Sequence, residues 1–249
     1  MQLTKQIIKV GNGAGVLVPR LWLGGTATVE LIDKPSDIKK DLLEVLESYM
    51  PDILSIALVG SYARHEQTSR SDIDVLVITH STSKQIKHGK YNIILISEKS
   101  LEKELQRNIL PWLPMLKEAK PVINSQLIEE LSKTQITKKN LEPHIALTKS
   151  AMNVVKEYLK IQEEKVSDNV AYSLGLRLRQ AYIVDCLLSG KKQSNKDLKK
   201  LIKKITGSLE LYNSYIRAKD DSKTQSILPI GEASKAYSYI LKRIGDQEK

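Results

Sequence analysis

Two aspartates, Asp72 and Asp74, stand two positions apart where the apolar run Ile73 to Thr79 begins. Residues two apart on an extended strand point to the same face of a sheet. Two neighbouring carboxylates repel each other unless a cation lies between them. A carboxylate pair that shares Mg²⁺ with phosphate oxygens is a common arrangement in proteins. The spacing therefore predicts a strand that binds Mg²⁺ or Mn²⁺.

A Gly-Ser corner, Gly60 and Ser61, follows a second apolar run, Leu54 to Val59. If a helix begins at Ser61, its first amides are unpaired and face an anion together with the Ser61 hydroxyl. Gly60 has no side chain, so a triphosphate can approach the backbone. Arg64, one turn further on, adds a positive charge. Corner and carboxylates together indicate phosphoryl or nucleotidyl transfer from a nucleoside triphosphate (NTP).

These motifs resemble the signature of the DNA polymerase β-type nucleotidyltransferase superfamily, in particular its minimal single-domain branch. The resemblance extends over roughly residues 36–100. It implies Asp72 and Asp74 as the catalytic metal ligands. It also implies nucleotide contacts at Gly60, Ser61, Arg64 and Ser71.

A third carboxylate completes the metal site in that family, on the next strand. The strand predicted here is Tyr91 to Ile96, and it carries Asn92 at the expected place. An amide oxygen can bind a hard cation, but it brings no charge and cannot act as a general base. Glu98, just after the strand, is a candidate substitute. The sequence thus allows either an active enzyme with Asn92 as a metal ligand or a retained fold with weakened catalysis.

The segment from Lys5 to Asp33 alternates β-branched runs with glycines and predicts short strands, among them Val16 to Val18 and Thr26 to Ile32. It resembles the SpoVT/AbrB-type swapped-hairpin domain, which forms intertwined dimers and in many members binds DNA. The resemblance implies a homodimer through residues 1–34. Its candidate nucleic-acid contacts are Lys5, Lys9 and Arg20. Dimerisation without DNA binding is the alternative.

The composition is that of an ordinary globular protein, with 41% hydrophobic and 27% charged residues. No apolar run approaches the ~20 residues of a membrane span, so we expect no membrane partner and a cytoplasmic location. The net charge is +10, and the chain from Lys138 onward contributes 22 − 13 = +9 of it. Such an excess suits RNA, DNA or an acidic partner protein, and equally a lysine-coated helical surface.

The second half of the chain predicts a helical bundle, with helices over about 143–164, 168–188, 194–205, 208–219 and 231–244. Arg177 and Arg179 lie within an apolar helix, where a guanidinium needs an anionic partner. They are predicted as acceptor or phosphate contacts, with a salt bridge to Asp185 as the alternative. The bundle resembles helical domains appended to nucleotidyltransferases, including HEPN-like ones. The Arg-His motif of HEPN ribonucleases is missing.

The predicted fold class is α+β in three parts: a β-hairpin dimerisation module (1–34), a mixed sheet with helices (35–135) and a helical bundle (136–249). The predicted function is Mg²⁺-dependent transfer of a nucleoside monophosphate from an NTP to a hydroxyl of a protein, an RNA or a small molecule. The alternative is a dimeric nucleic-acid-binding regulator whose nucleotidyltransferase fold is catalytically weakened. A third possibility is an antitoxin that modifies a partner protein.

Overall fold

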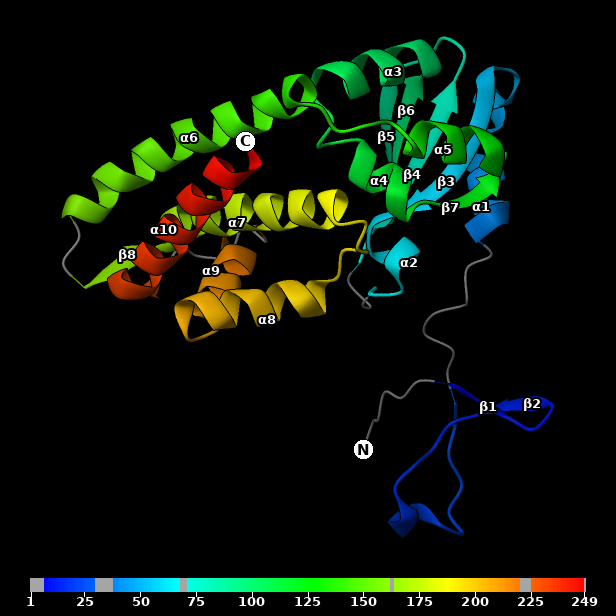
Figure 1. Cartoon of the computed structure of the whole chain (residues 1–249). Coiled ribbons are helices and arrows are strands. Elements are labelled where there is room, and N and C mark those ends of the chain that lie inside the picture. Colours follow the sequence, from blue (N-terminus) through cyan, green and yellow to red (C-terminus); the bar gives the residue numbers. More distant parts are fainter. Residues whose placement is uncertain (1–6, 30–37, 68–70, 162–163, 220–224, 249) are drawn as a thin grey trace. The chain divides into compact units, whose positions relative to one another are not determined.

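The computed structural model in Figure 1 describes residues 7–29, 38–67, 71–161, 164–219 and 225–248. The chain forms two compact units, residues 1–41 and residues 42–249. In the first unit, β1 (Ile8–Val10) pairs antiparallel with β2 (Gly13–Gly15), and a single 3-10 turn, η1 (Arg20–Trp22), follows.

Two strands predicted for the first unit are wrong over the residues that can be compared. Residues 16–19 form no strand, because the hairpin already turns at Gly11 and its second strand ends at Gly15. Residues 26–29 form no strand either, and the rest of that prediction lies outside the described residues. Lys5 also lies outside them, whereas Lys9 and Arg20 are described and exposed.

The second unit is α+β, and its five-stranded mixed sheet has the order β5-β6-β4-β3-β7. The strands are β3 (Ile53–Val59), β4 (Ile73–Thr79), β5 (Lys84–His88), β6 (Tyr91–Ser97) and β7 (Lys120–Ile123). Strand β4 runs parallel to β6, whereas the other neighbours are antiparallel. The central strands are nearly continuous apolar runs because both of their faces are covered. The edge strand β5 was not predicted from the sequence.

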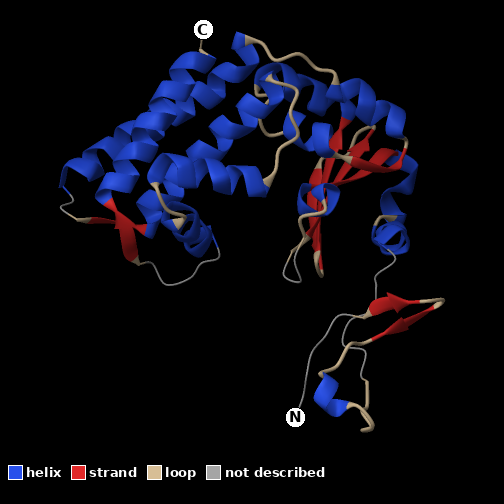
Figure 2. Cartoon of the chain, turned by 60° about the horizontal axis from the view of Figure 1, so that its bottom comes forward, coloured by secondary structure: helices blue, strands red, loops and turns tan. Residues whose placement is uncertain are grey.

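Five helices accompany the sheet: α1 (Ile38–Val45), α2 (Gly60–Arg64), α3 (Glu98–Arg107), α4 (Leu113–Glu118) and α5 (Ser125–Ser132); a 3-10 segment, η2 (Glu47–Asp52), lies before β3. Strand residues Ala57 and Leu76 share one buried cluster with Leu105 of α3 and Leu116 of α4. Trp112 packs against this cluster, so it belongs to the core. Figure 2 shows the sheet at one end of this unit with the helical bundle beside it.

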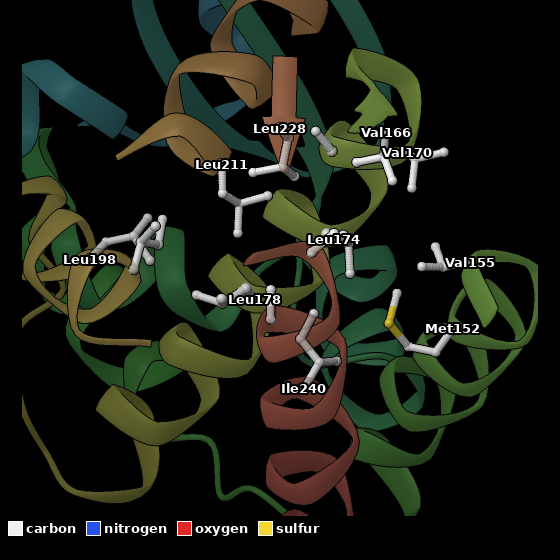
Figure 3. Packing of buried hydrophobic residues seen from close by; sticks show 14 residues of the cluster. Met152, Val155, Val166, Val170, Leu174, Leu178, Leu198, Leu211, Leu228 and Ile240 are labelled. Carbon is white, nitrogen blue, oxygen red and sulfur yellow. The ribbon is translucent and has the colours of Figure 1, made fainter. Parts of the chain in front are cut away.

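The helical bundle consists of α6 (Lys138–Ile161), α7 (Asp168–Leu188), α8 (Asn195–Thr206), α9 (Glu210–Lys219) and α10 (Ile230–Gln247). A buried core cluster separate from that of the sheet lies in the bundle. It includes Leu174 and Leu178 of α7, Ile240 of α10 and Met152 of α6, whose side chains converge in Figure 3. The bundle prediction is confirmed. Two short strands were not predicted: β8 (Lys165–Ser167) and β9 (Ser226–Pro229), which pair antiparallel.

A buried polar group lies where α6, α7 and α10 meet. Both ring nitrogens of His144 are buried without a hydrogen-bond partner in the described structure. The same is true of Thr148 Oγ1, Arg177 Nε and Gln247 Oε1. Burial, aided by the charge of Arg177 and only partly offset by Gln247, lowers the pKa of His144 to about 4. His144 is therefore neutral in the folded protein at physiological pH.

This burial predicts an acid-sensitive stability. The pKa of His144 in the unfolded chain is near the ordinary value of 6.5, so unfolding takes up a proton between pH 6.5 and about 4. The stabilisation is present above pH 6.5 and is lost as the pH falls, by up to about 3 kcal/mol. Urea titrations from pH 7 to pH 4 should show a shallower pH dependence for His144→Leu. The exposed His88→Leu should keep the wild-type slope. Equal slopes for all three proteins would contradict the expectation.

Candidate active site

Gly60 lies against Asp74 in the predicted site. Gly60 begins α2 directly after β3, and Asp74 pairs with Val59 on the neighbouring strand β4. A Cβ atom on Gly60 would lie 2.5 Å from Asp74 Oδ2, and the backbone φ of Gly60 is +68°. Only glycine accommodates both conditions without strain. The fold thus brings the Gly-Ser corner and the second aspartate together, as the sequence predicted.

Asp72 and Asn92 flank this contact. Asp72 lies just before β4 and is exposed, and the half-buried Ser71 precedes it. Asn92 stands directly opposite Asp74 on the parallel strand β6, and its amide Nδ2 donates to Asp74 Oδ1 over 3.1 Å. Its Oδ1 accepts a hydrogen bond from Gln85 Nε2 over 3.0 Å. In this arrangement Asn92 orients the Asp74 carboxylate.

Glu98 does not replace the missing third carboxylate. It begins α3 beyond the far end of β6, six residues from Asn92, which is roughly 20 Å along a strand. Across the described ranges no three His, Cys, Asp or Glu side chains gather in a metal-binding group. Two carboxylates nevertheless suit Mg²⁺, which usually keeps several waters and takes its other ligands from substrate phosphates. The donor set at Asp72 and Asp74 therefore fits that ion.

The Gly-Ser corner contacts an internal carboxylate that the sequence did not suggest. The Gly60 amide donates to Glu118 Oε1 over 2.7 Å, and Arg64 Nη1 donates to Glu118 Oε2 over 2.6 Å. Glu118 lies at the end of α4, and its side chain is only 9% exposed. The amide and the guanidinium predicted to bind phosphate are thus paired with a protein anion. A phosphate at this corner would have to replace the Glu118 carboxylate on both donors.

The helical bundle contacts the same group, which we call the clasp: Arg64, Glu66, Glu118, Gln193 and Asn195. Gln193 Nε2 donates to Glu118 Oε2, and the backbone N–H of Asn195 donates to Glu66 Oε1 over 2.8 Å. Arg64 Nε also donates to Glu66 Oε2 over 3.0 Å. Burial opposes ionisation of Arg64, but Glu118 and Glu66 outweigh it and raise the pKa of the guanidinium. The clasp therefore joins the sheet domain to the start of α8.

A cleft of about 560 Å³ opens beside the clasp. One wall comes from α2, α4 and the start of β7, and the other from the end of α7 and the segment before α8. Ala63, Pro114, Ile183 and Leu187 contribute apolar surface, and Arg64 and Glu118 border the cleft. Cys186 also lines it, and burial raises the pKa of that thiol, which makes it less reactive.

The structure separates the two arginines predicted as substrate contacts. Arg179 borders a small space that Arg64 and Gln193 also line, and its Nη1 donates to Tyr215 Oη over 3.4 Å. Arg177 lies near His144 and donates to Gln180. Residues two apart on a helix lie on nearly opposite sides, so one arginine faces the clasp and the other does not. Asp185 pairs with Arg243 instead of either.

Comparison with known families agrees with this geometry. A family model described as a nucleotidyltransferase domain matches residues 39–168, more than half of the 249 residues. The chain belongs to the nucleotidyltransferase domain family. The matched segment contains the Gly-Ser corner, both aspartates and Asn92. Nucleotidyl transfer is therefore the general chemistry of this fold.

The proteins that this chain resembles match it to different extents. A Methanocaldococcus jannaschii protein named "Putative protein adenylyltransferase" is 42% identical over 60 residues, which are 24% of this chain and 59% of that relative. A nucleotidyltransferase-like protein of Exiguobacterium sibiricum has a TM-score of 0.37 at 13% identity, over 84% of this chain and 75% of its own. The spectinomycin adenyltransferase AAD(9) of Enterococcus faecialis has a TM-score of 0.45 at 14% identity, over 83% of this chain and 97% of its own. Among the described helices of our chain, none combines the length and apolarity that crossing a bilayer requires.

Gly60→Ala is expected to destabilise the protein by about 2 kcal/mol, because alanine is strained at positive φ and its methyl group would collide with Asp74. The displaced carboxylate should also weaken binding of Mg²⁺-NTP. Urea denaturation and calorimetric titration measure the two effects. Gly89→Ala is the matched control, since its φ is +55° and no atom lies within 4 Å of the added Cβ. Equal losses in both variants would mean that contact with Asp74 is unimportant.

Proposed function

We propose that this protein is a Mg²⁺-dependent nucleotidyltransferase that moves a nucleoside monophosphate from an NTP to an acceptor hydroxyl. The observation that supports the proposal is the close approach of Gly60 to Asp74, which brings the Gly-Ser corner next to the second aspartate. Asp72, exposed just before the strand, would be the second metal ligand. These two carboxylates would hold Mg²⁺, which would supply electrostatic stabilisation of the charge that develops on the transferred phosphoryl group.

The remaining work falls to side chains of the chain itself. Asn92 orients Asp74 through its amide, so Oδ2 stays directed toward Gly60. The Gly60 amide, the Ser61 hydroxyl and Arg64 would bind the β- and γ-phosphates, with Ser71 beside the nucleotide. The acceptor oxygen bonds to the α-phosphorus while the bond from that phosphorus to pyrophosphate breaks. The hydroxyl proton would leave to water, because the amide of Asn92 cannot accept it.

The experiment incubates the purified chain with α-labelled NTPs and Mg²⁺ or Mn²⁺, alone and with protein, RNA or small-molecule acceptors. ATP is the first donor to test, because the Methanocaldococcus relative is named as an adenylyltransferase. Its name also makes a protein hydroxyl one of the acceptor classes. The proposal expects metal-dependent label transfer and release of pyrophosphate. Absence of NTP binding in the presence of either metal would overturn it.

A second candidate function is a dimeric, cytoplasmic nucleic-acid-binding regulator, and the first unit supplies the supporting observation. Leu21 is 97% exposed, Leu23 85% and Leu17 70%, which suits a surface covered by a second copy in a SpoVT/AbrB-like dimer. Light scattering should show a dimer that Leu21→Asp weakens. Nucleic-acid affinity should fall with salt and with Lys9→Glu or Arg20→Glu. A monomer that ignores DNA and RNA would exclude this function.

A further inference from the structure

The cleft beside the clasp is strongly cationic. Its border carries five basic side chains: Arg64, Lys117, Lys120, Lys191 and Lys192. Glu118 is the one carboxylate among its lining residues, and it is already paired with Arg64 at 2.6 Å. Lys120 contacts the ring of His65. Across the described residues, no ion pair involves Lys117, Lys191 or Lys192, so their charges are available to a ligand.

Asp74 and the cleft-lining Glu118 approach Gly60 at different atoms. Asp74 approaches the position where a Gly60 Cβ would stand, whereas Glu118 approaches the Gly60 amide from the cleft. Neither Asp72, Asp74 nor Ser61 lines the cleft. Arg64, which is assigned to the nucleotide, stands at the edge of the cleft, so a nucleotide held at Asp72 and Asp74 leaves the part lined by Lys117, Lys191 and Lys192 open to a second molecule. The two ligands would meet at Gly60.

The size and charge of the cleft restrict that second molecule. A volume of about 560 Å³ suits a small molecule or the last nucleotide of a chain, not a folded surface. Four positive charges remain after Arg64 is matched with Glu118, which is a dense field for so small a space. Phosphate groups concentrate negative charge more compactly than single carboxylates do. A cationic acceptor would be repelled there.

We propose that the cleft binds the acceptor, and that this acceptor carries a phosphate group near the hydroxyl that becomes nucleotidylated. The inference rests on the proposed nucleotidyltransferase function and adds its substrate class. Lys191 and Lys192, from the segment between α7 and α8, bind the phosphate together with Lys117 of α4. The acceptor hydroxyl oxygen attacks the α-phosphorus, pyrophosphate leaves and the proton passes to water. A free sugar phosphate and a terminal nucleotide both carry this chemistry, and the probes below distinguish the two sources.

The test measures binding to the full-length protein by calorimetry, so it does not depend on turnover. The probes are ribose 5-phosphate, a 5′-phosphorylated dinucleotide, unphosphorylated ribose and spectinomycin, each with saturating Mg²⁺ and a non-hydrolysable NTP. At least one phosphorylated probe should bind, and ribose and spectinomycin should not. Preference for ribose 5-phosphate indicates a small acceptor, whereas preference for the dinucleotide indicates a nucleic-acid end.

Charge reversal provides the second arm. The double variant Lys191→Glu, Lys192→Glu should weaken binding of the phosphorylated probe roughly tenfold or more. Lys203→Glu, an exposed lysine of α8 outside the cleft, should not change it. Both sites lie on the surface, so circular dichroism should confirm intact folds. Unchanged probe binding in the double variant would overturn the proposal, and so would competition between probe and NTP, which would assign the cleft to the nucleotide's own phosphates. Failure of NTP binding itself would instead count against the proposed function.

Discussion

Asp74→Asn is expected to reduce nucleotide transfer by roughly a thousandfold or more, because a metal-held phosphate gains several kcal/mol of transition-state stabilisation. Asp74 is the carboxylate that contacts both the phosphate corner and Asn92. The substitution keeps the shape of the side chain, and an amide oxygen can still accept from Asn92 Nδ2. The fold should therefore persist while activity disappears. The measurement is initial rate of label transfer at saturating Mg²⁺ and NTP.

The control for this prediction is Asp197→Asn. Asp197 is an exposed carboxylate of α8 that pairs with Lys200, far along the chain from the predicted metal ligands. The substitution Asp197→Asn removes the same charge as Asp74→Asn and should leave the rate of label transfer unchanged. Thermal denaturation of both variants separates loss of chemistry from loss of fold. If Asp74→Asn transferred nucleotide at the wild-type rate, the metal role of this strand would be refuted.

Local signals in the sequence were enough for most of the fold. The run Leu54 to Val59 predicted β3 to within one residue, and α7 spans the predicted range 168–188. The pairing of Asp74 with Asn92 could be inferred because both stand at the starts of adjacent apolar strands. These elements have strong periodicity and clear boundaries, so the chain itself determines them.

The elements that sequence reasoning missed depend on partners distant in the chain. Strand β5 is polar and mostly exposed, and pairing with β6 alone makes it a strand. Its Lys84 and Lys87 are typical of a protected sheet edge. Glu118 reaches Gly60 across 58 positions, and no pattern near either residue indicates that contact. The separation of Arg177 and Arg179 could have been inferred from the sequence, because residues two apart in a helix lie on nearly opposite sides of it.

The clasp connects several of the contacts that sequence reasoning missed. Its residues come from α2 and the loop after it, from α4 and from the segment that begins α8, so the phosphate corner and the helical bundle share hydrogen bonds. A phosphate that took the Gly60 amide would have to compete with Glu118 for it. Any ligand that displaced Glu118 would also weaken its bond to Gln193. Ligand binding at the corner and packing of the bundle are therefore energetically linked.

The largest effect on stability is expected at the ion pair that closes the bundle. Arg217 of α9 binds Asp168 through Nε and Nη2, both at 3.0 Å, and the Asp168 side chain is 1% exposed. Burial alone would raise the pKa of Asp168, but hydrogen bonds from Arg217 and from the Gln225 amide outweigh it and lower that pKa. Arg217→Met would leave a buried carboxylate without its cation, a loss of about 3–5 kcal/mol in the free energy of unfolding.

The comparison with Arg243→Met makes this prediction specific. Arg243 pairs with Asp185 through the same two kinds of atom, but Asp185 is 26% exposed and keeps a hydrogen bond from Gln247. Its loss should cost about 1 kcal/mol, since water can solvate the remaining carboxylate. Urea denaturation at pH 7 measures both. The deficit of Arg217→Met should then shrink as the pH falls toward 5, because the unpaired Asp168 has a raised pKa and is buried at lower cost once protonated. Equal losses for the two arginines, or a deficit independent of pH, would show that burial of Asp168 does not control the stability of the bundle.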